Sequence, residues 1–317
     1  MTKIILTFLK YAFLLILVIA IGFCALNWRN DLPLSELKQK YANAESKFVE
    51  IDGMKVHYRD EGITTDSIPL VLIHGTGASL HTWEGWVKAL KANHRIITFD
   101  LPAYGLTGPN AQGDYSQDYY VEFVEKLLVK LAVKKCVLGG NSLGGGITWA
   151  YALAHPERVQ KMILVDAGGY PMKSKSIPIA FQLARLPVLS NLFKYVTPRS
   201  VIEKSIRNVY VHDERITDKL IDRYYDLALR EGNRTAFIER MKISVQSDKY
   251  LKIKTLTMPT LIIWGKQDGL IPLTVGEQFH QDLVNDTLVI FEDLGHTPME
   301  EDAENTVKVI EGFLNKI

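Results

Sequence analysis

The sequence reads Val137-Leu138-Gly139-Gly140-Asn141-Ser142-Leu143-Gly144-Gly145-Gly146 near the middle of the chain, an apolar run that breaks into glycines around one serine. The spacing Gly140-x-Ser142-x-Gly144 is typical of a nucleophile elbow, a sharp turn from a strand into a helix. Such a turn strains the backbone of the serine and leaves no room for side chains two residues before and after it. We therefore expect a buried strand, an exposed Ser142 hydroxyl and a helix that begins beside it.

Apolar, strand-like runs that end in polar loops lie on both sides of this turn. Upstream, residues 69–73 lead into His74-Gly75-Thr76-Gly77, a turn whose N–H groups can face the elbow. Downstream, residues 260–264 precede Asp268, and residues 287–291 precede His296. The candidate side chains therefore follow strands in the order Ser, Asp, His. This order is the one that an α/β-hydrolase requires, and it differs from the chymotrypsin and subtilisin orders.

Over residues 47–317 the chain resembles the α/β-hydrolase superfamily. Besides the elbow, the resemblance is carried by His74-Gly75, Gly265-x-x-Asp268, Gly295-His296 and the turn Asp100-Leu101-Pro102-Ala103-Tyr104-Gly105. Ala103 stands where the family usually has a glycine in this turn. The resemblance implies a mostly parallel sheet with helices on both faces and a helical cap over the active site.

Strand-like and helical patterns alternate along the rest of the chain, which itself predicts a mostly parallel sheet covered on both faces. Residues 48–51 and 54–58 flank Asp52-Gly53 and predict a β-hairpin. We expect a core of residues 47–170 and 256–317, interrupted by a helical cap over residues 171–255. The remaining expected strands and two of the expected helices are residues 70–73, 95–99, 135–138, 161–165, 260–264 and 287–291, and residues 117–131 and 305–314.

The motif assigns a role to each candidate catalytic residue. Ser142 would attack an acyl carbonyl, His296 would take its proton, and Asp268 would orient the imidazole. The backbone N–H groups of Thr76 and Leu143 would form the oxyanion hole.

Other titratable residues compete for these roles. His74 and His81 precede the first core helix, a position that suits structural hydrogen bonds better than catalysis. Asp166 ends the preceding strand, and some family members recruit their acid from that position. We expect Asp268 to be the catalytic acid.

Composition is that of a medium-sized enzyme domain. The 317 residues are 47% hydrophobic and 23% charged, and the net charge of +1 gives no sign of a nucleic-acid partner. The two cysteines, Cys24 and Cys136, lie in different environments, so no disulfide between them is expected. The sequence has no Cys/His cluster with metal-ligand spacing, no G-x-G-x-x-G motif and no P-loop. We therefore expect catalysis without a cofactor or metal.

The N-terminus is apolar enough to cross a membrane. Residues 4–26 contain one charged side chain, that of Lys10, and as a helix would measure about 34 Å against a hydrocarbon core of about 30 Å. We expect a retained single-pass anchor and a polar linker over residues 27–46; the alternative is a signal peptide cleaved before secretion. Lys3 and Lys10, against Arg29 offset by Asp31, favour an extracytoplasmic catalytic domain.

The cap region is basic and rich in apolar residues. Residues 171–255 hold 17 Lys and Arg against 9 Asp and Glu, which predicts either a solvated helical surface or a contact with anionic lipid headgroups. The apolar residues between positions 177 and 193 are expected to pack on the core or to line an acyl pocket. A lipid bilayer is thus an expected partner, and protein partners stay open.

The predicted reaction is hydrolysis of carboxylic esters. A serine at position 142 excludes haloalkane dehalogenase and epoxide hydrolase chemistry, which needs a carboxylate nucleophile. In pattern the chain is most similar to membrane-anchored monoacylglycerol lipases and lipid esterases, which share the anchor, the Trp264-Gly265-Lys266-x-Asp268 loop and the Gly-His loop. This resemblance implies an apolar or lipid ester substrate. Two alternatives stay open: a carbon–carbon bond hydrolase of aromatic-ring degradation, suggested by Gly140-Asn141-Ser142-x-Gly144-Gly145, and a non-catalytic ligand receptor.

Overall fold

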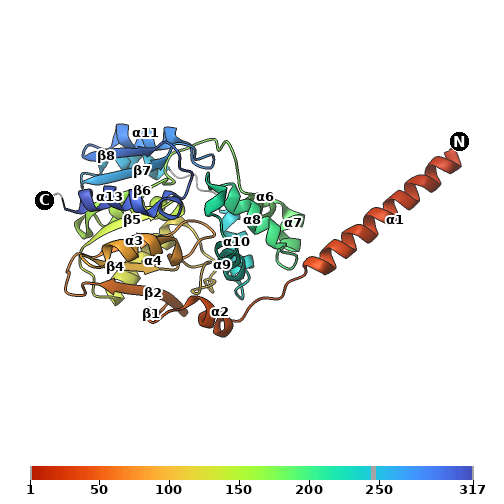
Figure 1. Ribbon diagram of the computed structural model, residues 1–317, viewed down its shortest axis with the longest axis horizontal. Coiled ribbons are helices and arrows are strands. Elements are labelled where there is room, and N and C mark those ends of the chain that lie inside the picture. The colour runs from red at the N-terminus through yellow and green to blue at the C-terminus, as the bar shows by residue number, and fades with distance from the viewer. Residues whose placement is uncertain (1, 244–247, 316–317) are drawn as a thin grey trace.

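A computed structural model describes residues 2–243 and 248–315 of the chain, as an α/β core, a helical cap and a long N-terminal helix that extends away from both (Figure 1). The sheet has eight strands in the order β1-β2-β4-β3-β5-β6-β7-β8. β1, β2 and β4 pair antiparallel, and the neighbours from β4 to β8 are parallel. The strands are β1 Ser46–Ile51, β2 Met54–Gly62, β3 Leu70–Ile73, β4 Arg95–Phe99, β5 Cys136–Asn141, β6 Val159–Val165, β7 Thr260–Gly265 and β8 Asp286–Phe291.

Helices cover both faces of the sheet, because successive residues of a strand point to opposite sides. In β5, Leu138 packs into the apolar cluster under α4, α5 and α11, whereas its neighbour Val137 packs into the cluster under α3 and α13. The core helices are α3 Glu84–Leu90, α4 Gln117–Lys130, α5 Leu143–Ala154, α11 Leu273–Asp282, α12 Pro298–Glu301 and α13 Ala303–Leu314, with short 3₁₀ helices at Leu80–Trp83 and Pro156–Arg158.

The expected α/β architecture is confirmed, including the hairpin, in which Ile51 and Met54 pair across the turn. Five of the six expected parallel-sheet runs fall inside strands, and the sixth, 135–138, begins one residue before β5. Ala103, which stands at the usual glycine position, adopts a positive φ of 82°. The turn thus keeps the left-handed conformation that a glycine would adopt without strain.

The cap lies between β6 and β7 and has apolar clusters of its own. Its last helical segment, at Asp248–Thr255, returns to the core, since Ile253 and Leu256 belong to the core cluster. In Figure 1 the cap sits at one end of the sheet, between the core and the N-terminal helix. The cap helices are α6 Ile179–Arg185, α7 Pro187–Phe193, α8 Arg199–Arg207, α9 Asp218–Ala228 and α10 Asn233–Lys242, with a 3₁₀ turn at Asp213–Arg215.

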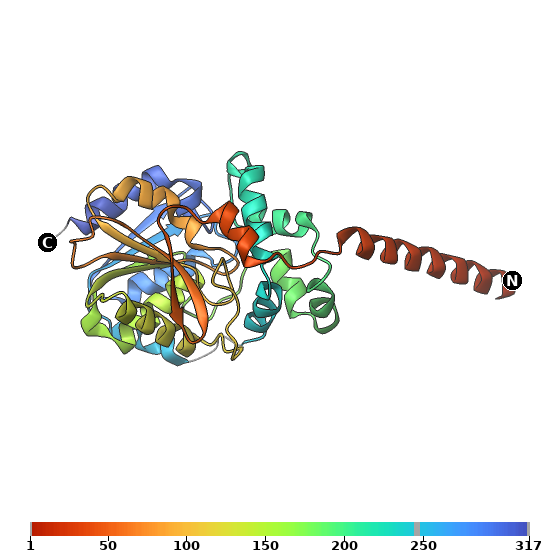
Figure 2. The ribbon, with the colours of Figure 1, turned by 90° about the horizontal axis from the view of Figure 1, so that it is seen from below.

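The N-terminal helix α1, Thr2–Asn27, is apolar and leaves its sides uncovered. In the part of the chain that the structure describes, it is the one helix long and apolar enough to cross a membrane, with a mean hydropathy of 2.7 and none of that window buried. Figures 1 and 2 show α1 projecting from the side of the molecule where the cap lies.

Residues 27–46 are more ordered than the expected linker. Helix α2, Leu34–Tyr41, buries Leu37 completely against Leu106 of the core and Leu227 of the cap. The segment is polar on average, but its three leucines, Leu32, Leu34 and Leu37, all pack in this cluster. The segment therefore connects α1 to the core while packing against the cap.

Candidate active site

Ser142 occupies a strained turn between β5 and α5. Its backbone has φ 54° and ψ −114°, a combination that L-residues adopt only when the surroundings enforce it. A Cβ atom at Gly140 would lie 2.3 Å from the carbonyl carbon of Gly144, and one at Gly144 would lie 2.1 Å from the carbonyl oxygen of Ile73. These contacts explain why both flanking positions must be glycine.

Asp268 and His296 meet beyond the carboxyl ends of β7 and β8. His296 Nδ1 lies 2.6 Å from Asp268 Oδ2, and both side chains are buried. The other oxygen of Asp268 accepts hydrogen bonds from the backbone N–H groups of Leu270 and Ile271 at 2.7 and 3.0 Å. Asp268 is thus fixed in place and can hold the imidazole in one orientation.

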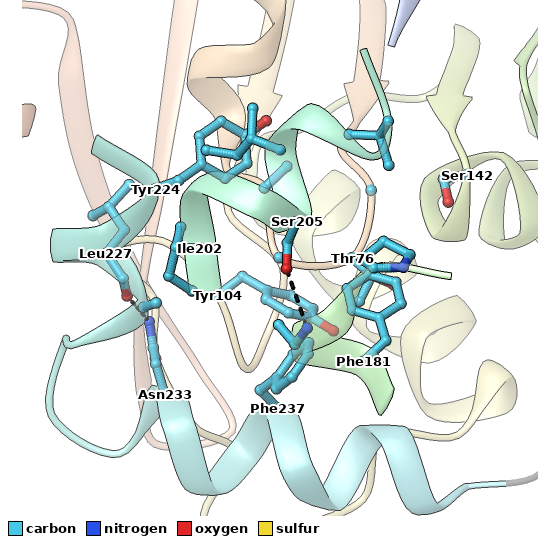
Figure 3. A pocket seen from close by; sticks show the side chains of 18 of the residues that line it. Thr76, Tyr104, Ser142, Phe181, Ile202, Ser205, Tyr224, Leu227, Asn233 and Phe237 are labelled. Atoms are coloured by element: carbon cyan, nitrogen blue, oxygen red, sulfur yellow. Dashed lines mark hydrogen bonds between the residues drawn. The ribbon is translucent and has the colours of Figure 1, made fainter. Parts of the chain in front are cut away.

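Ser142, His296 and Thr76 line one cavity between core and cap. Figure 3 shows Ser142 at one end of this cavity, with Leu227 and Asn233 of the cap at the other end of the view. Ser142 Oγ makes no hydrogen bond to His296 within residues 2–243 and 248–315; such bonds often tighten only when substrate is bound. The N–H of Leu143 is the first of helix α5 and so has no helical carbonyl partner.

The loop that carries His296 is held from the cap, which the sequence did not reveal. The N–H of His296 donates to the carbonyl of Val209 at 2.9 Å. Glu301 accepts hydrogen bonds from the N–H groups of Gly295 and Val211 at 2.8 and 2.7 Å. On the core side, the Asn141 amide donates to the carbonyl of His296 at 2.9 Å. The cap and the candidate general base are therefore physically linked.

Asp166 lies near Asp268 and His296, but the hydrogen bond to the imidazole comes from Asp268. Its Oδ1 accepts the N–H of Gly265 at 3.0 Å, and its Oδ2 is buried without a partner among the described residues. Burial, and then the nearby charge of Asp268, raise the pKa of Asp166 well above its usual value. The surroundings thus favour the protonated form of Asp166, whereas the hydrogen bond to His296 belongs to Asp268.

His74 and His81 are both engaged in structural hydrogen bonds. His74 Nδ1 donates to the carbonyl of Gly75 at 2.8 Å, and its Nε2 accepts the N–H of Leu101 at 2.9 Å. Burial lowers the pKa of His74 and lowers that of His81 to about 4. His81 Nδ1 pairs with Ser79 at 2.9 Å. Neither imidazole is free to act as a general base.

Asp166, Asp268 and His296 together offer three possible metal-ligand atoms within 4.8 Å of one another. The short hydrogen bond between His296 and Asp268 already uses one nitrogen and one oxygen of that set. A cation would have to replace this hydrogen bond. The same atoms serve a catalytic triad without a metal, and that chemistry stays our prediction.

The cap side of the cavity is mainly apolar. Phe181 of α6 and Phe237 of α10 pack together with ring centroids 5.6 Å apart, and Figure 3 shows both rings beside the cavity. Arg234 is the one Lys or Arg that lines the cavity among the described residues, and its guanidinium is paired with Asp31 at 2.6 Å. The apolar lining residues of the cap are Pro178, Ala180, Phe181, Phe193, Ile202, Ile206, Val209, Leu227, Ala228 and Phe237.

Comparison with known proteins agrees with this geometry. Residues 68–303 match the alpha/beta hydrolase fold family. The chain is 28% identical to a 2-hydroxy-6-oxononadienedioate/2-hydroxy-6-oxononatrienedioate hydrolase of Burkholderia vietnamiensis, over 86% of this chain and 97% of that protein. It is 26% identical to a meta-cleavage product hydrolase of Pseudomonas fluorescens, with a TM-score of 0.74, over 86% of this chain and 99% of that structure.

A third similarity concerns the fold alone. The crystal structure of a membrane phospholipase A is 24% identical, with a TM-score of 0.73, over 99% of this chain and 98% of that one. A match of this extent includes the N-terminal helix. At this identity the similarity says nothing of the reaction.

The relatives overturn the expected ester cleavage and the similarity to monoacylglycerol lipases. The two hydrolases at 28% and 26% identity match over nearly their whole length, and both are carbon–carbon bond hydrolases, which was the alternative interpretation of the elbow sequence. The error arose because the assignment rested on the apolar N-terminus and on loops that the whole fold family shares. The chain is a hydrolase, and it belongs to the alpha/beta hydrolase fold family.

Proposed function

We propose that the protein hydrolyses the carbon–carbon bond beside the ketone of a 2-hydroxy-6-oxodienoate whose carbon 6 carries an apolar group. The observation that carries the proposal is the near full-length match to a hydrolase of this substrate class. The dioate in the name of that relative's substrate is a second carboxylate. Here the cap wall is mainly apolar and Arg234, its one Lys or Arg among the described residues, is already paired, so a hydrocarbon substituent fits better than a carboxylate.

The reaction needs a carbon leaving group that can accept an electron pair. In the 2-oxo tautomer, the electron pair of the bond between carbons 5 and 6 delocalises through the neighbouring double bond onto the 2-oxo oxygen. This tautomer carries the former 2-hydroxyl proton on carbon 5. Ser142 Oγ bonds to carbon 6, the bond between carbons 5 and 6 breaks, and the dienolate takes the proton released by Ser142 and leaves as a 2-hydroxydienoate. Water then hydrolyses the acyl ester on Ser142 and releases the carboxylic acid that carries the apolar group.

In this proposal His296 accepts the Ser142 proton and then gives it to the leaving group. Asp268 keeps the imidazole oriented through the 2.6 Å hydrogen bond. The N–H groups of Thr76 and Leu143 stabilise the oxyanion formed at carbon 6. Each such donor typically contributes about 2.7 to 4 kcal/mol to transition-state stabilisation.

The test compares three substrates with the full chain. A 2-hydroxy-6-oxohexa-2,4-dienoate with phenyl on carbon 6 should be consumed, measured as loss of dienolate absorbance. Its kcat/KM should exceed that of the 2-carboxyethyl analogue by about tenfold, as expected for about 1.4 kcal/mol of hydrocarbon burial. Ser142→Ala should lower turnover by about 10³-fold or more. Rapid hydrolysis of p-nitrophenyl butyrate with the phenyl ketone left intact would refute the proposal.

The N-terminal helix supports a second part of the proposal, a retained membrane anchor with the catalytic domain outside the cytoplasm. Its 26 residues measure about 39 Å as a helix, enough to cross the hydrocarbon core of a bilayer. The carbonyl of Asn27, the last residue of this helix, accepts the N–H of Thr197, and two residues later the N–H of Arg29 donates to the carbonyl of Tyr195. The exit from the helix is thus part of the folded cap.

Membrane fractionation tests the anchor. The full chain should sediment with membranes and stay there through carbonate washing, because apolar insertion is not screened by ions. Protease added to intact cells should reach the catalytic domain. Recovery of a mature protein that begins near Asn27 would instead establish secretion after signal cleavage.

A further inference from the structure

The cap carries an exposed apolar face beside the end of α1. Helix α7 turns Phe193 and Ser190 inward and leaves Val188, Leu189 and Leu192 exposed, with Val188 at 81% exposure. Leu186, in the link from α6, is exposed as well. Burial of such side chains is favourable by roughly 25 cal/mol per Å² of apolar surface. A partner that covered these side chains would therefore gain binding free energy from their burial.

This face continues directly into the N-terminal helix. Trp28, the first residue after α1, stacks on Tyr195 with ring centroids 5.1 Å apart and planes 13° apart, and both rings are half-exposed. Trp28 also pairs with Val196 as an isolated β-bridge. Figures 1 and 2 agree in placing α7 close to the inner end of α1. Trp and Tyr are enriched where membrane proteins cross the boundary between water and lipid.

The chain segment that carries this face is basic. Residues 167–202 contain five basic residues and no Asp or Glu. Arg185 and Lys194, at the ends of α6 and α7, form no ion pair within the described residues. Arg199, by contrast, is neutralised by Asp218 and Asp222. The unpaired cations suit an anionic headgroup layer.

We propose that this juxtamembrane face, formed by Trp28, Leu186, Val188, Leu189, Leu192 and Tyr195, lies in the headgroup region of the bilayer as a second membrane contact. The proposal rests on the retained anchor proposed above. If α1 crosses the bilayer, its inner end and Trp28 mark the lipid boundary, and α7 beside them reaches the same depth. A protein partner on this face would have to share the space with the bilayer.

The same two helices also line the cavity. Phe181 of α6 and Phe193 of α7 face the cavity that contains Ser142, while the outer side of α7 carries the exposed residues. One layer of helix thus separates the bilayer contact from the substrate cavity. An apolar substrate dissolved in the membrane would meet the enzyme at this wall.

Fluorescence in bilayers tests the contact. The full chain, with Cys24→Ala, is reconstituted into anionic liposomes after labelling of Val188→Cys with the environment-sensitive dye NBD. Val284→Cys, 73% exposed in the core loop before β8, is the matched control. Cys136 is buried, and burial raises the pKa of its thiol to about 12, so it should stay unlabelled.

We expect blue-shifted emission at position 188 and quenching by brominated phosphatidylcholine several-fold stronger than at position 284. Equal quenching at both positions, with the chain still resistant to carbonate, would overturn this contact and leave the anchor intact. A blue shift without lipid quenching that is lost on dilution among liposomes would assign the face to a second copy of the chain. Release of the chain by carbonate would refute the anchor, and this contact with it.

Discussion

The core and the cap hold their two sides of the cavity by different means. On the core side the backbone sets the geometry: Cβ atoms at Gly144 and Gly265 would lie 2.1 and 2.0 Å from neighbouring carbonyl oxygens. Ser142 is held at a positive φ between those close contacts. On the cap side the wall consists of apolar side chains on short helices, such as Phe181 and Phe237, that pack in small clusters.

We infer that the core side of the cavity determines which reaction takes place, whereas the cap side determines which substrate is preferred. A backbone-defined site tolerates almost no change, since the close contacts leave no space for a methyl group. A wall of apolar side chains on short helices changes its shape with each substitution while the helices persist. We therefore expect substitutions on the core side to abolish activity or folding, and those on the cap side to change which substrate is preferred.

After loss of the nucleophile itself, the largest effect is expected at the acid that orients His296. Asp268→Asn should lower kcat/KM by about 10³ to 10⁴-fold, because the imidazole loses its oriented tautomer and the charge that stabilises it. Asp166→Asn is the matched control and should cost less than about tenfold, since asparagine resembles the protonated form that burial of Asp166 favours. Steady-state kinetics measures both. If Asp166→Asn proved the more harmful, the two carboxyl groups would have to exchange roles.

A methyl group in the elbow should cost stability. In Gly144→Ala the new Cβ would sit 2.1 Å from the Ile73 carbonyl oxygen, so the free energy of unfolding should fall by about 3 kcal/mol. Gly312→Ala, with nothing within 4 Å of its Cβ, is the matched control and should raise the stability of α13 by up to about 1 kcal/mol. Urea unfolding of both variants decides. Equal stabilities would mean that the elbow is not rigid.

On the cap side the expected effect is smaller and selective. Phe237→Ala removes one ring of the Phe181–Phe237 pair from the cavity wall. We expect about a tenfold loss of kcat/KM for the phenyl-bearing ketone, mainly through KM, equivalent to about 1.4 kcal/mol. The methyl-bearing ketone is the internal control and should change little. An equal loss on both substrates would indicate that the cap helps to position the catalytic groups.

The raised pKa of Asp166 should make the stability of the protein depend on pH. Its pKa is raised in the folded protein above the ordinary 3.8, so the folded state keeps a proton that the unfolded state releases. Stability of the native protein therefore falls as pH rises from about 3.8 toward the folded-state pKa. Asp166→Asn removes this dependence, so its stability relative to the native protein should increase between pH 4 and pH 8. A difference that stays constant across that range would show that Asp166 is ionised.

The core site was predictable because its constraints are local in sequence. Glycines around Ser142, before Asp268 and before His296 mark close backbone contacts, and those positions match the turns that the structure forms. The order of the three residues along the chain then fixed which strands carry them. The catalytic roles themselves stay predictions.

Other features depend on partners that are distant along the chain. Glu301 accepts hydrogen bonds from the N–H groups of Gly295 and Val211. The residues next to Glu301 in the sequence do not indicate these partners. The apolar residues of α7 were expected to pack or to line a pocket; Phe193 does, but Val188, Leu189 and Leu192 are exposed. Sequence hydrophobicity alone does not distinguish side chains that are buried in the protein from side chains that are exposed on its surface.

The junction after α1 has a mechanical consequence. Hydrogen bonds join Asn27 and Arg29 to the cap, and Arg234 of the cap forms an ion pair with Asp31. The end of the helix is therefore attached to the cap. If α1 is embedded in a bilayer, a displacement of this helix acts first on the cap. Since the cap is hydrogen-bonded to the catalytic loop through Val209 and Val211, a force from the membrane would reach His296 through these bonds.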